Sequence, residues 1–261
     1  LFQNLNIMQR TGYMATSLTE IKNRADVIIV FGNKLFEKSP RLLEKVLQTK
    51  NSLCSDIRKK EIILIGDFSK NIIHKIKKSS GVTNIKLNLD MIPDLMQLLS
   101  SDTKSINTKI LSKTNLNKII KVISGSKYLV ATWMGSDFLK NKNPEKIISS
   151  ISKYIVNYNE NKRGACAPIA GPLGDITSSQ TLAWMTGFAS RIKFTDTTFH
   201  HDRMAYNGDL LVTNKNVDTV IHISTIASNK LEINKNLYNI VLGHPNSTFT
   251  NTPDIFIPVG I

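Results

Sequence analysis

A glycine- and hydroxyl-rich segment, residues 163–180, carries the groups best suited to bind an anion. Gly171 and Gly174 follow an apolar run, and Thr177 and Ser178 stand where a helix can begin. The free amides at the start of a helix attract phosphate and other anions, so the segment fits a pyrophosphate. A tight turn with an ordinary helix cap explains the same residues equally well, because the spacing matches neither a P-loop nor a dinucleotide-binding G-x-G-x-x-G signature.

The five histidines offer little for metal or acid–base chemistry. His200, His201 and Asp202 are a cluster of ligand types, but adjacent residues of a helix or strand point in different directions, so one metal seldom takes both imidazoles. His244 follows Gly243 at the end of an apolar strand pattern, without a partnered carboxylate or nucleophile in the sequence. We therefore expect no metal site and no catalytic residue on this chain.

The element that would position such residues is a parallel sheet. Residues 27–31, Val-Ile-Ile-Val-Phe, have the length and β-branching of a strand that is covered on both faces. Gly32 and Asn33 follow it, and a helix is expected to begin at Ser39. Because open α/β sheets bind ligands at the carboxyl ends of their strands, Gly32 and Asn33 are further candidate binding residues.

The turn that leads into this strand is polar. Ser17 and Glu20 have the spacing of a capping box. We expect Arg24 and Asp26 to be buried at the entrance of the strand and paired with each other or with nearby backbone, since an unpaired buried charge costs several kcal/mol.

Helical and extended patterns alternate along the chain. Helices are expected over residues 39–50, 91–100, 116–123, 144–158 and 178–190. Strands are expected over residues 25–31, 61–65, 84–89, 128–132, 217–223, 238–242 and 255–259. Strands separated by helices predict right-handed crossovers and a mostly parallel sheet, hence an α/β fold of Rossmann-like units.

Three stretches, in the right order, resemble one family. Residues 20–26 read Glu-Ile-Lys-Asn-Arg-Ala-Asp, residues 182–188 read Leu-Ala-Trp-Met-Thr-Gly-Phe, and the closing strands lie in 239–244 and 252–260. They resemble the B subunit of formylmethanofuran dehydrogenase, a molybdopterin oxidoreductase, and its relative in the methylotrophic formyltransferase/hydrolase complex.

The resemblance implies a division into two domains. In molybdopterin oxidoreductases one α/β domain interrupts another, which would give a discontinuous Rossmann-like domain of residues 1–60 and 159–261. Residues 61–158 would form the inserted α/β domain. The strands at 26–31 and 217–223 would then be neighbours in one sheet. Because the first residue is Leu and no element closes the last strand, we expect a fragment of a longer polypeptide.

Two functions follow from the resemblance. In the first, the chain is a non-redox structural subunit of a formyltransferase/hydrolase complex in one-carbon metabolism. Other subunits would then transfer a formyl group from tetrahydromethanopterin to a methanofuran-type cofactor and hydrolyse it to formate. In the second, the chain is the redox subunit of a formylmethanofuran dehydrogenase, with a molybdenum or tungsten bis-pterin guanine dinucleotide that interconverts carbon dioxide and formate.

Departures from the family pattern favour the first function. Lys34 stands where metal–pterin enzymes usually place a proline after Gly-Asn, and no glycine-rich continuation follows residues 182–188. No cofactor is then expected on this chain, and the candidate binding residues would be the remnant of an ancestral pocket. These loops, which should converge, contain Gly32, Asn33, Gly171, Gly174, Thr177, Ser178, Gly243 and His244.

Composition narrows the partners and the compartment. The net charge is +14, but the lysines are scattered among asparagines without interleaved aromatic residues, so no nucleic-acid partner is expected. No stretch approaches the length of a membrane span. Cys54 and Cys166 are too few for a cysteine-ligated cluster within this segment and suit a reduced, cytoplasmic location.

Overall fold

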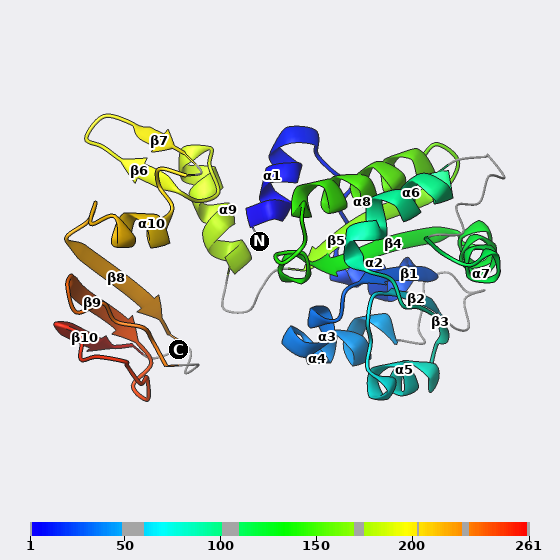
Figure 1. Ribbon diagram of the computed structural model, residues 1–261, viewed down its shortest axis with the longest axis horizontal. Helices are drawn as coiled ribbons and strands as arrows, with labels where there is room; N and C mark the ends of the chain where they lie inside the picture. The colour runs from blue at the N-terminus through cyan, green and yellow to red at the C-terminus, as the bar shows by residue number, and fades with distance from the viewer. Residues whose placement is uncertain are drawn as a thin grey trace. The chain divides into compact units, whose positions relative to one another are not determined.

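The computed structural model describes residues 2–48, 60–100, 110–169, 175–202, 204–225 and 230–259 (Figure 1). The chain divides into two compact units, residues 1–176 and residues 177–261. Each unit is described by itself.

Unit 1 is built on a five-stranded parallel sheet with the strand order β3-β2-β1-β4-β5. The strands are β1 (Val27–Phe31), β2 (Glu61–Ile65), β3 (Gly81–Ile85), β4 (Tyr128–Met134) and β5 (Arg163–Ile169). The helices are α1 (Phe2–Thr11), α2 (Leu18–Arg24), α3 (Lys34–Lys38), α4 (Pro40–Leu42), α5 (Lys70–Lys77), α6 (Ile92–Ser100), α7 (Lys113–Ser124) and α8 (Pro144–Tyr158), with short helical turns η1 (Leu43–Leu47), η2 (Leu89–Met91) and η3 (Gly135–Asp137).

Two helical layers cover this sheet. On β1, Ile29 and Phe31 face a core formed with α1, α6, α7 and α8, whereas Ile28 and Val30 face a core formed with α2, α3, η1 and α5. Every residue of β1 is buried, as expected for a strand covered on both faces. Figure 1 shows α6 and α8 above the sheet and α3, α4 and α5 below it.

Local sequence signals set the helix starts. The Ser17 hydroxyl accepts a hydrogen bond from the Glu20 amide at 3.1 Å, which confirms the expected cap of α2. The Asn143 side chain likewise accepts from the Lys146 amide at 3.0 Å, with a proline at the first position of α8.

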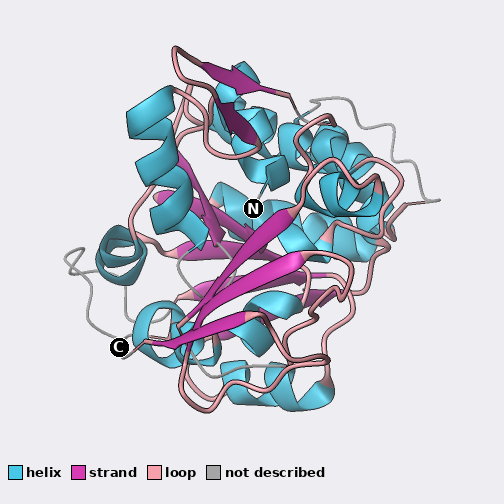
Figure 2. Cartoon of the chain, turned by 90° about the vertical axis from the view of Figure 1, so that its left-hand side faces the viewer, coloured by secondary structure: helices cyan, strands magenta, loops and turns pink. Residues whose placement is uncertain are grey.

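Unit 2 contains a helix, a hairpin and a second parallel sheet. Helix α9 (Asp175–Thr186) leads into an antiparallel pair, β6 (Ile192–Phe194) and β7 (Phe199–His201), followed by α10 (Gly208–Thr213). The parallel sheet has the order β10-β9-β8, with β8 (Thr219–Ser224), β9 (Tyr238–Gly243) and β10 (Ile255–Pro258). Figure 2 turns this unit towards the viewer.

The α/β class with two parallel sheets is confirmed. The domain boundaries expected from the sequence differ from the observed units, because β1 lies in one sheet with β2, β3 and β4, on both sides of the expected boundary at residue 61. The pairing of strands 26–31 and 217–223 is wrong, since β2 and β4 occupy both edges of β1 and β8 pairs with β9.

Two element boundaries also need correction. A helix begins at Lys34, directly after Asn33, ahead of the helix expected from Ser39. The strand expected over residues 84–89 is β3, which ends at Ile85 because Asn88 caps a helical turn.

Candidate functional site

The carboxyl edge of the five-stranded sheet is the place where a ligand would be expected. The strand order reverses direction between β1 and β4, and open parallel sheets bind their ligands at such a switch point. Gly32 and Asn33 follow β1 there, while Ser136 and Asp137 follow β4. The structure therefore brings two predicted residues to the switch point, together with an aspartate that the sequence analysis did not single out.

Gly32 is packed closely against the Asp137 side chain at this edge. Its φ of +80° lies in the left-handed region, which glycine adopts without strain. Its amide donates a hydrogen bond to the carbonyl oxygen of Ile65 at 3.0 Å, which ties the end of β1 to β2. A Cβ atom built on Gly32 would lie 2.3 Å from the Asp137 carboxyl carbon, so the space above this glycine is already filled.

The carboxyl group of Asp137 occupies that space. Its Oδ1 accepts a hydrogen bond from the Lys34 amide at 3.1 Å, and the Lys34 ammonium donates to the carbonyl oxygen of Ser136 at 2.7 Å. Within the described residues the buried Oδ2 atom has no hydrogen-bond partner. Burial raises the pKa of Asp137 to about 6, although the nearby Lys34 amide and ammonium lower it.

The end of the neighbouring strand, β2, also contacts Gly32 and Asn33. The Asn33 side-chain amide donates to the carbonyl oxygen of Asp67 at 3.3 Å, just after β2. Gly66 has φ of +136°, and a Cβ atom built on it would lie 3.5 Å from the Gly32 backbone nitrogen. Backbone and side chains of the protein itself thus occupy the edge of the sheet around Gly32 and Asn33.

The second predicted pair, Gly243 and His244, lies in unit 2 at the carboxyl end of β9. The His244 amide donates to the carbonyl oxygen of Ser224 at 2.9 Å, and its Nδ1 accepts from the Asn246 amide at 3.0 Å. The imidazole therefore holds a turn and carries its proton on Nε2. A Cβ atom on Gly243 would lie 3.1 Å from the ring of Phe256, which leaves this strand end closely packed.

The third predicted loop is only partly described. Gly171 and Gly174 lie outside the described residues. Thr177 and Ser178 were expected to cap a helix, but α9 begins at Asp175 and places both of them inside its first turns, where both are exposed. The prediction that they cap the helix is therefore wrong. The convergence of the three loops stays a prediction.

The family-like stretch 20–26 acts at the opposite, amino edge of the sheet. The Glu20 carboxylate pairs with Arg163 at the start of β5 and accepts a hydrogen bond from Thr16 at 3.0 Å. The Arg163 guanidinium lies 4.7 Å from the ring centre of Tyr128, at the start of β4. This cluster joins α2 to two strand entrances.

Asp26 also stabilises a strand entrance, and a second aspartate, Asp254, does the same in unit 2. The Asp26 carboxylate accepts from the amides of Lys127 and Tyr128 at 2.7 and 2.8 Å. In unit 2, Asp254 precedes β10 and accepts from the Asn239 amide at 2.7 Å, at the start of β9. In both cases an aspartate directly before one strand caps the entrance of its neighbour, so these motif residues are structural.

Arg24 does not follow the expectation. It is exposed and lies 3.7 Å from the Glu20 carboxylate, one helical turn away, so its predicted burial is wrong. Asp26 is half-buried and bonded to backbone, as expected.

The histidine cluster is divided among separate contacts. His201 stacks on Phe188 with ring centres 4.8 Å apart, and its Nδ1 lies 2.9 Å from the carbonyl oxygen of Ser190. Asp202 accepts from two following amides, those of Ala205 and Met204, which lowers its pKa. Among the described residues, no three His, Cys, Asp or Glu side chains are grouped as metal ligands.

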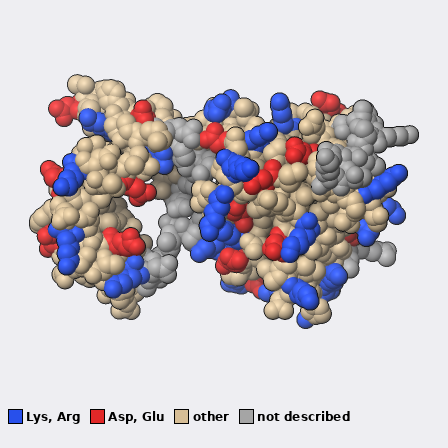
Figure 3. All heavy atoms as spheres, viewed as in Figure 1, with Lys and Arg blue, Asp and Glu red and all other residues tan. Residues whose placement is uncertain are grey.

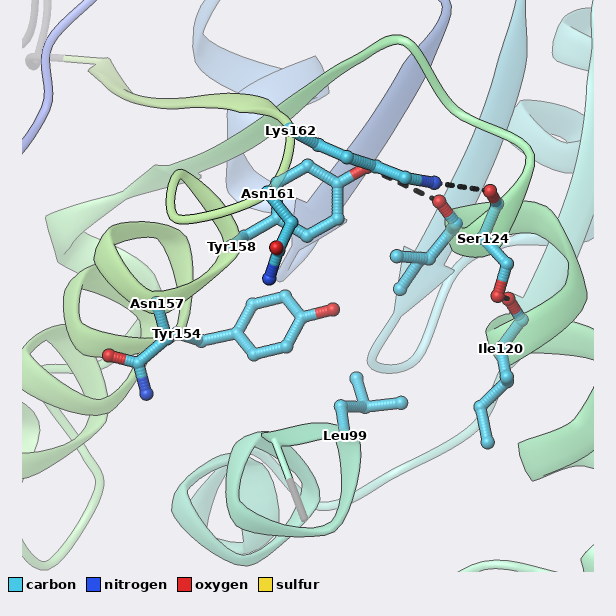
Figure 4. Close-up of a pocket in the computed structure, with 9 residues that line it drawn as sticks. Leu99, Ile120, Ser124, Tyr154, Asn157, Tyr158, Asn161 and Lys162 are labelled. Carbon is cyan, nitrogen blue, oxygen red and sulfur yellow. Dashed lines mark hydrogen bonds between the residues drawn. The ribbon is translucent and has the colours of Figure 1, made fainter. Parts of the chain in front are cut away.

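A hollow of about 270 Å³ between α6, α7 and α8 was not predicted (Figure 4). Figure 4 shows the hydroxyl of Tyr154 pointing into it, beside Leu99. The Lys162 ammonium donates to the carbonyl oxygen of Ser124, and Tyr158 bonds to Ser126 at 2.5 Å. Burial raises the pKa of both tyrosines, so their phenols stay neutral, and the one charged group among the described lining residues is the Lys162 ammonium.

On the face drawn in Figure 3, Lys and Arg are interspersed with Asp and Glu across the surface. None of the helices in the described ranges is long and apolar enough to cross a membrane.

The comparisons with known proteins give a structural likeness without a match in sequence. No family model matches the chain, and no curated protein matches it by sequence. Among solved structures, the chain is similar to a subunit in the crystal structure of the formyltransferase/hydrolase complex from Methylorubrum extorquens in complex with methylofuran. The TM-score is 0.77 at 18% identity, over 100% of this chain and 69% of that one. The two chains share a fold.

Proposed function

We propose that this chain is a B-like structural subunit of a formyltransferase/hydrolase complex of one-carbon metabolism. In such a complex other subunits would transfer and hydrolyse the formyl group on a methanofuran-type cofactor. Two independent lines support the proposal, namely the family-like stretches 20–26 and 182–188 and the shared fold along the full chain.

The observation that carries the non-redox role is the filled switch point. A cofactor held against the backbone of Gly32 at this sheet edge would meet the Asp137 carboxyl group, which occupies the space above this glycine. A buried carboxylate there would also repel the phosphates of a pterin dinucleotide. We therefore assign no cofactor to this edge.

The sheet of unit 2 supports the role of a subunit. Parallel register places Ile221, Ile240 and Ile255 in one row, and Ile223, Leu242 and Ile257 in the next. In β8, Ile221 is 61% exposed and Ile223 is 74% exposed within this structure. Parallel sheets are normally covered on both faces, so we assign this apolar face, defined by the two rows, to the surface of a partner subunit.

Metal and pterin analysis of the native complex tests the proposal. The complex should be purified from its source through a tag on this chain, and assayed for formyl transfer and for molybdenum, tungsten and oxidised pterins. Formyl-transfer activity without either metal or pterin is expected. Molybdenum or tungsten near one atom per chain, together with pterin, would instead establish the redox alternative.

A further inference from the structure

A large hollow in unit 2 lies between α9, the β6–β7 hairpin and α10. Its volume is about 810 Å³, within the range of about 300–1,000 Å³ that is typical of small-molecule sites. The lining residues are Leu182, Arg191, Ile192, Lys193, Phe194, Ala205, Tyr206, Leu211, Asn216 and Val217. Among the residues that the structure describes, this lining combines an apolar wall and two aromatic rings with two cations and no acid.

Arg191 is held on this wall in a conformation that costs free energy. Its φ is +56°, in the left-handed region that side chains other than glycine and asparagine rarely adopt. The Nδ1 atom of His201 lies 2.9 Å from the carbonyl oxygen of Ser190 and 3.2 Å from that of Arg191. With its proton on Nδ1, this imidazole donates to both carbonyls and stabilises the turn that presents Arg191.

A second part of the lining also follows an unusual backbone conformation. Within the described residues, Arg191 and Lys215 are the two non-glycine residues with positive φ, and Lys215 directly precedes the lining residue Asn216. There the chain turns back after α10, with the Asn216 amide bonded to the carbonyl oxygen of Leu211 at 2.9 Å. Both turns therefore border the same hollow.

We propose that this hollow binds a small organic anion with a flat apolar body. Arg191 and Lys193 receive the anionic group, and the body lies against Leu182, Tyr206 and Leu211. Charge-assisted hydrogen bonds to the two cations give preference for an anion over a neutral molecule of the same shape. This site goes beyond the proposed function and does not depend on it.

Two fluorescent probes with the same ring system test the site on the full chain. One is anionic, 1-anilinonaphthalene-8-sulfonate, and the other is neutral, N-phenyl-1-naphthylamine. We expect the anion to bind about tenfold more tightly than the neutral probe, the effect of one or two charge-assisted contacts. Equal affinity for the two probes would overturn the proposal.

Three variants locate the binding. Lys193→Gln should remove most of the preference for the anion, whereas Lys146→Gln, a matched lysine of unit 1, should leave it unchanged. Ala205→Trp should fill the hollow and weaken both probes. An unchanged preference for the anionic probe in Lys193→Gln would contradict the assignment of the anion to this hollow. Undiminished binding of the two probes to a folded Ala205→Trp variant would also contradict it.

Arg191→Gly separates a binding role from a structural one. Glycine accepts the left-handed conformation without strain, so the melting temperature should stay the same or rise, while the preference for the anion falls. A lower melting temperature with unchanged preference would show that Arg191 serves packing alone, and would overturn its role in binding.

Discussion

The carboxyl group of Asp137 lies directly against the α-carbon of Gly32. A Cβ on that glycine would come within 2.3 to 2.7 Å of three Asp137 atoms. One residue follows β1 and the other follows β4, so the contact joins the two strands that flank the switch point. The contact places an internal carboxylate at the edge where parallel sheets bind their ligands.

Gly32→Ala should destabilise unit 1 strongly. The added methyl group meets both an unfavourable φ, which costs about 1–3 kcal/mol, and the Asp137 carboxyl group. Gly12→Ala is the matched control, because Gly12 has φ of +65° with nothing within 4 Å of its Cβ position. Urea denaturation should give the larger loss of unfolding free energy for Gly32→Ala, and equal losses would show that Asp137 does not fill the space above Gly32.

The Asp137 contact should also make stability depend on pH. Because its pKa is about 6 in the folded state and 3.8 in the unfolded chain, the folded state binds more protons between those values. The stability that this group contributes is therefore complete below about pH 4 and is lost as the pH rises through about 6.

Asp137→Asn removes that titration. Relative to the natural protein, the variant should gain about 1–2 kcal/mol of unfolding free energy between pH 4 and pH 7.5, after allowance for solvent around the carboxyl group. Denaturation of both proteins at the two pH values measures the difference. Parallel pH profiles would contradict the raised pKa.

The polar turn before β1 offers a direct comparison of two neighbouring charges. Asp26→Ala should cost about 1–3 kcal/mol, because two amides at the entrance of β4 lose their acceptor. Arg24→Ala removes an exposed pair at 3.7 Å and should cost less than about 0.5 kcal/mol. Thermal melting of the two variants measures the difference. A larger loss of stability for Arg24→Ala than for Asp26→Ala would contradict the structural role of Asp26.

Periodicity and caps predicted β1, β2, β4, α6, α7 and α8 of unit 1, whereas β5, α1, α5 and the long-range pairings were not predicted. The run 27–31, the capping box at Ser17 and the helix over 144–158 depend on neighbours in the sequence, and all three agree with the structure. The role of Asp137 depends on a residue at the end of another strand, so no local pattern reveals it. The prediction that the strand at 217–223 pairs with β1 was wrong for the same reason, because strand order depends on the whole fold.

Buried polar groups were the other feature hidden from the sequence. Lys60 is 3% exposed, and its ammonium donates to the carbonyl oxygens of Ile21 and Lys22 at 2.7 and 2.6 Å, at the end of α2. One lysine among many carries no signal of burial in sequence.

The apolar face of the β8-β9-β10 sheet gives the sharpest test of a subunit role. Ile223 is 74% exposed on this face, so Ile223→Lys should leave the free energy of unfolding of the isolated chain almost unchanged. A charge at the centre of a covered interface is costly, and we expect the variant to lose most of its recovery of partner subunits after tag purification. Leu139→Lys, at a position of unit 1 that is 57% exposed, is the matched control and should recover them as the natural chain does. Full recovery with Ile223→Lys would mean that this face is not where partner subunits bind.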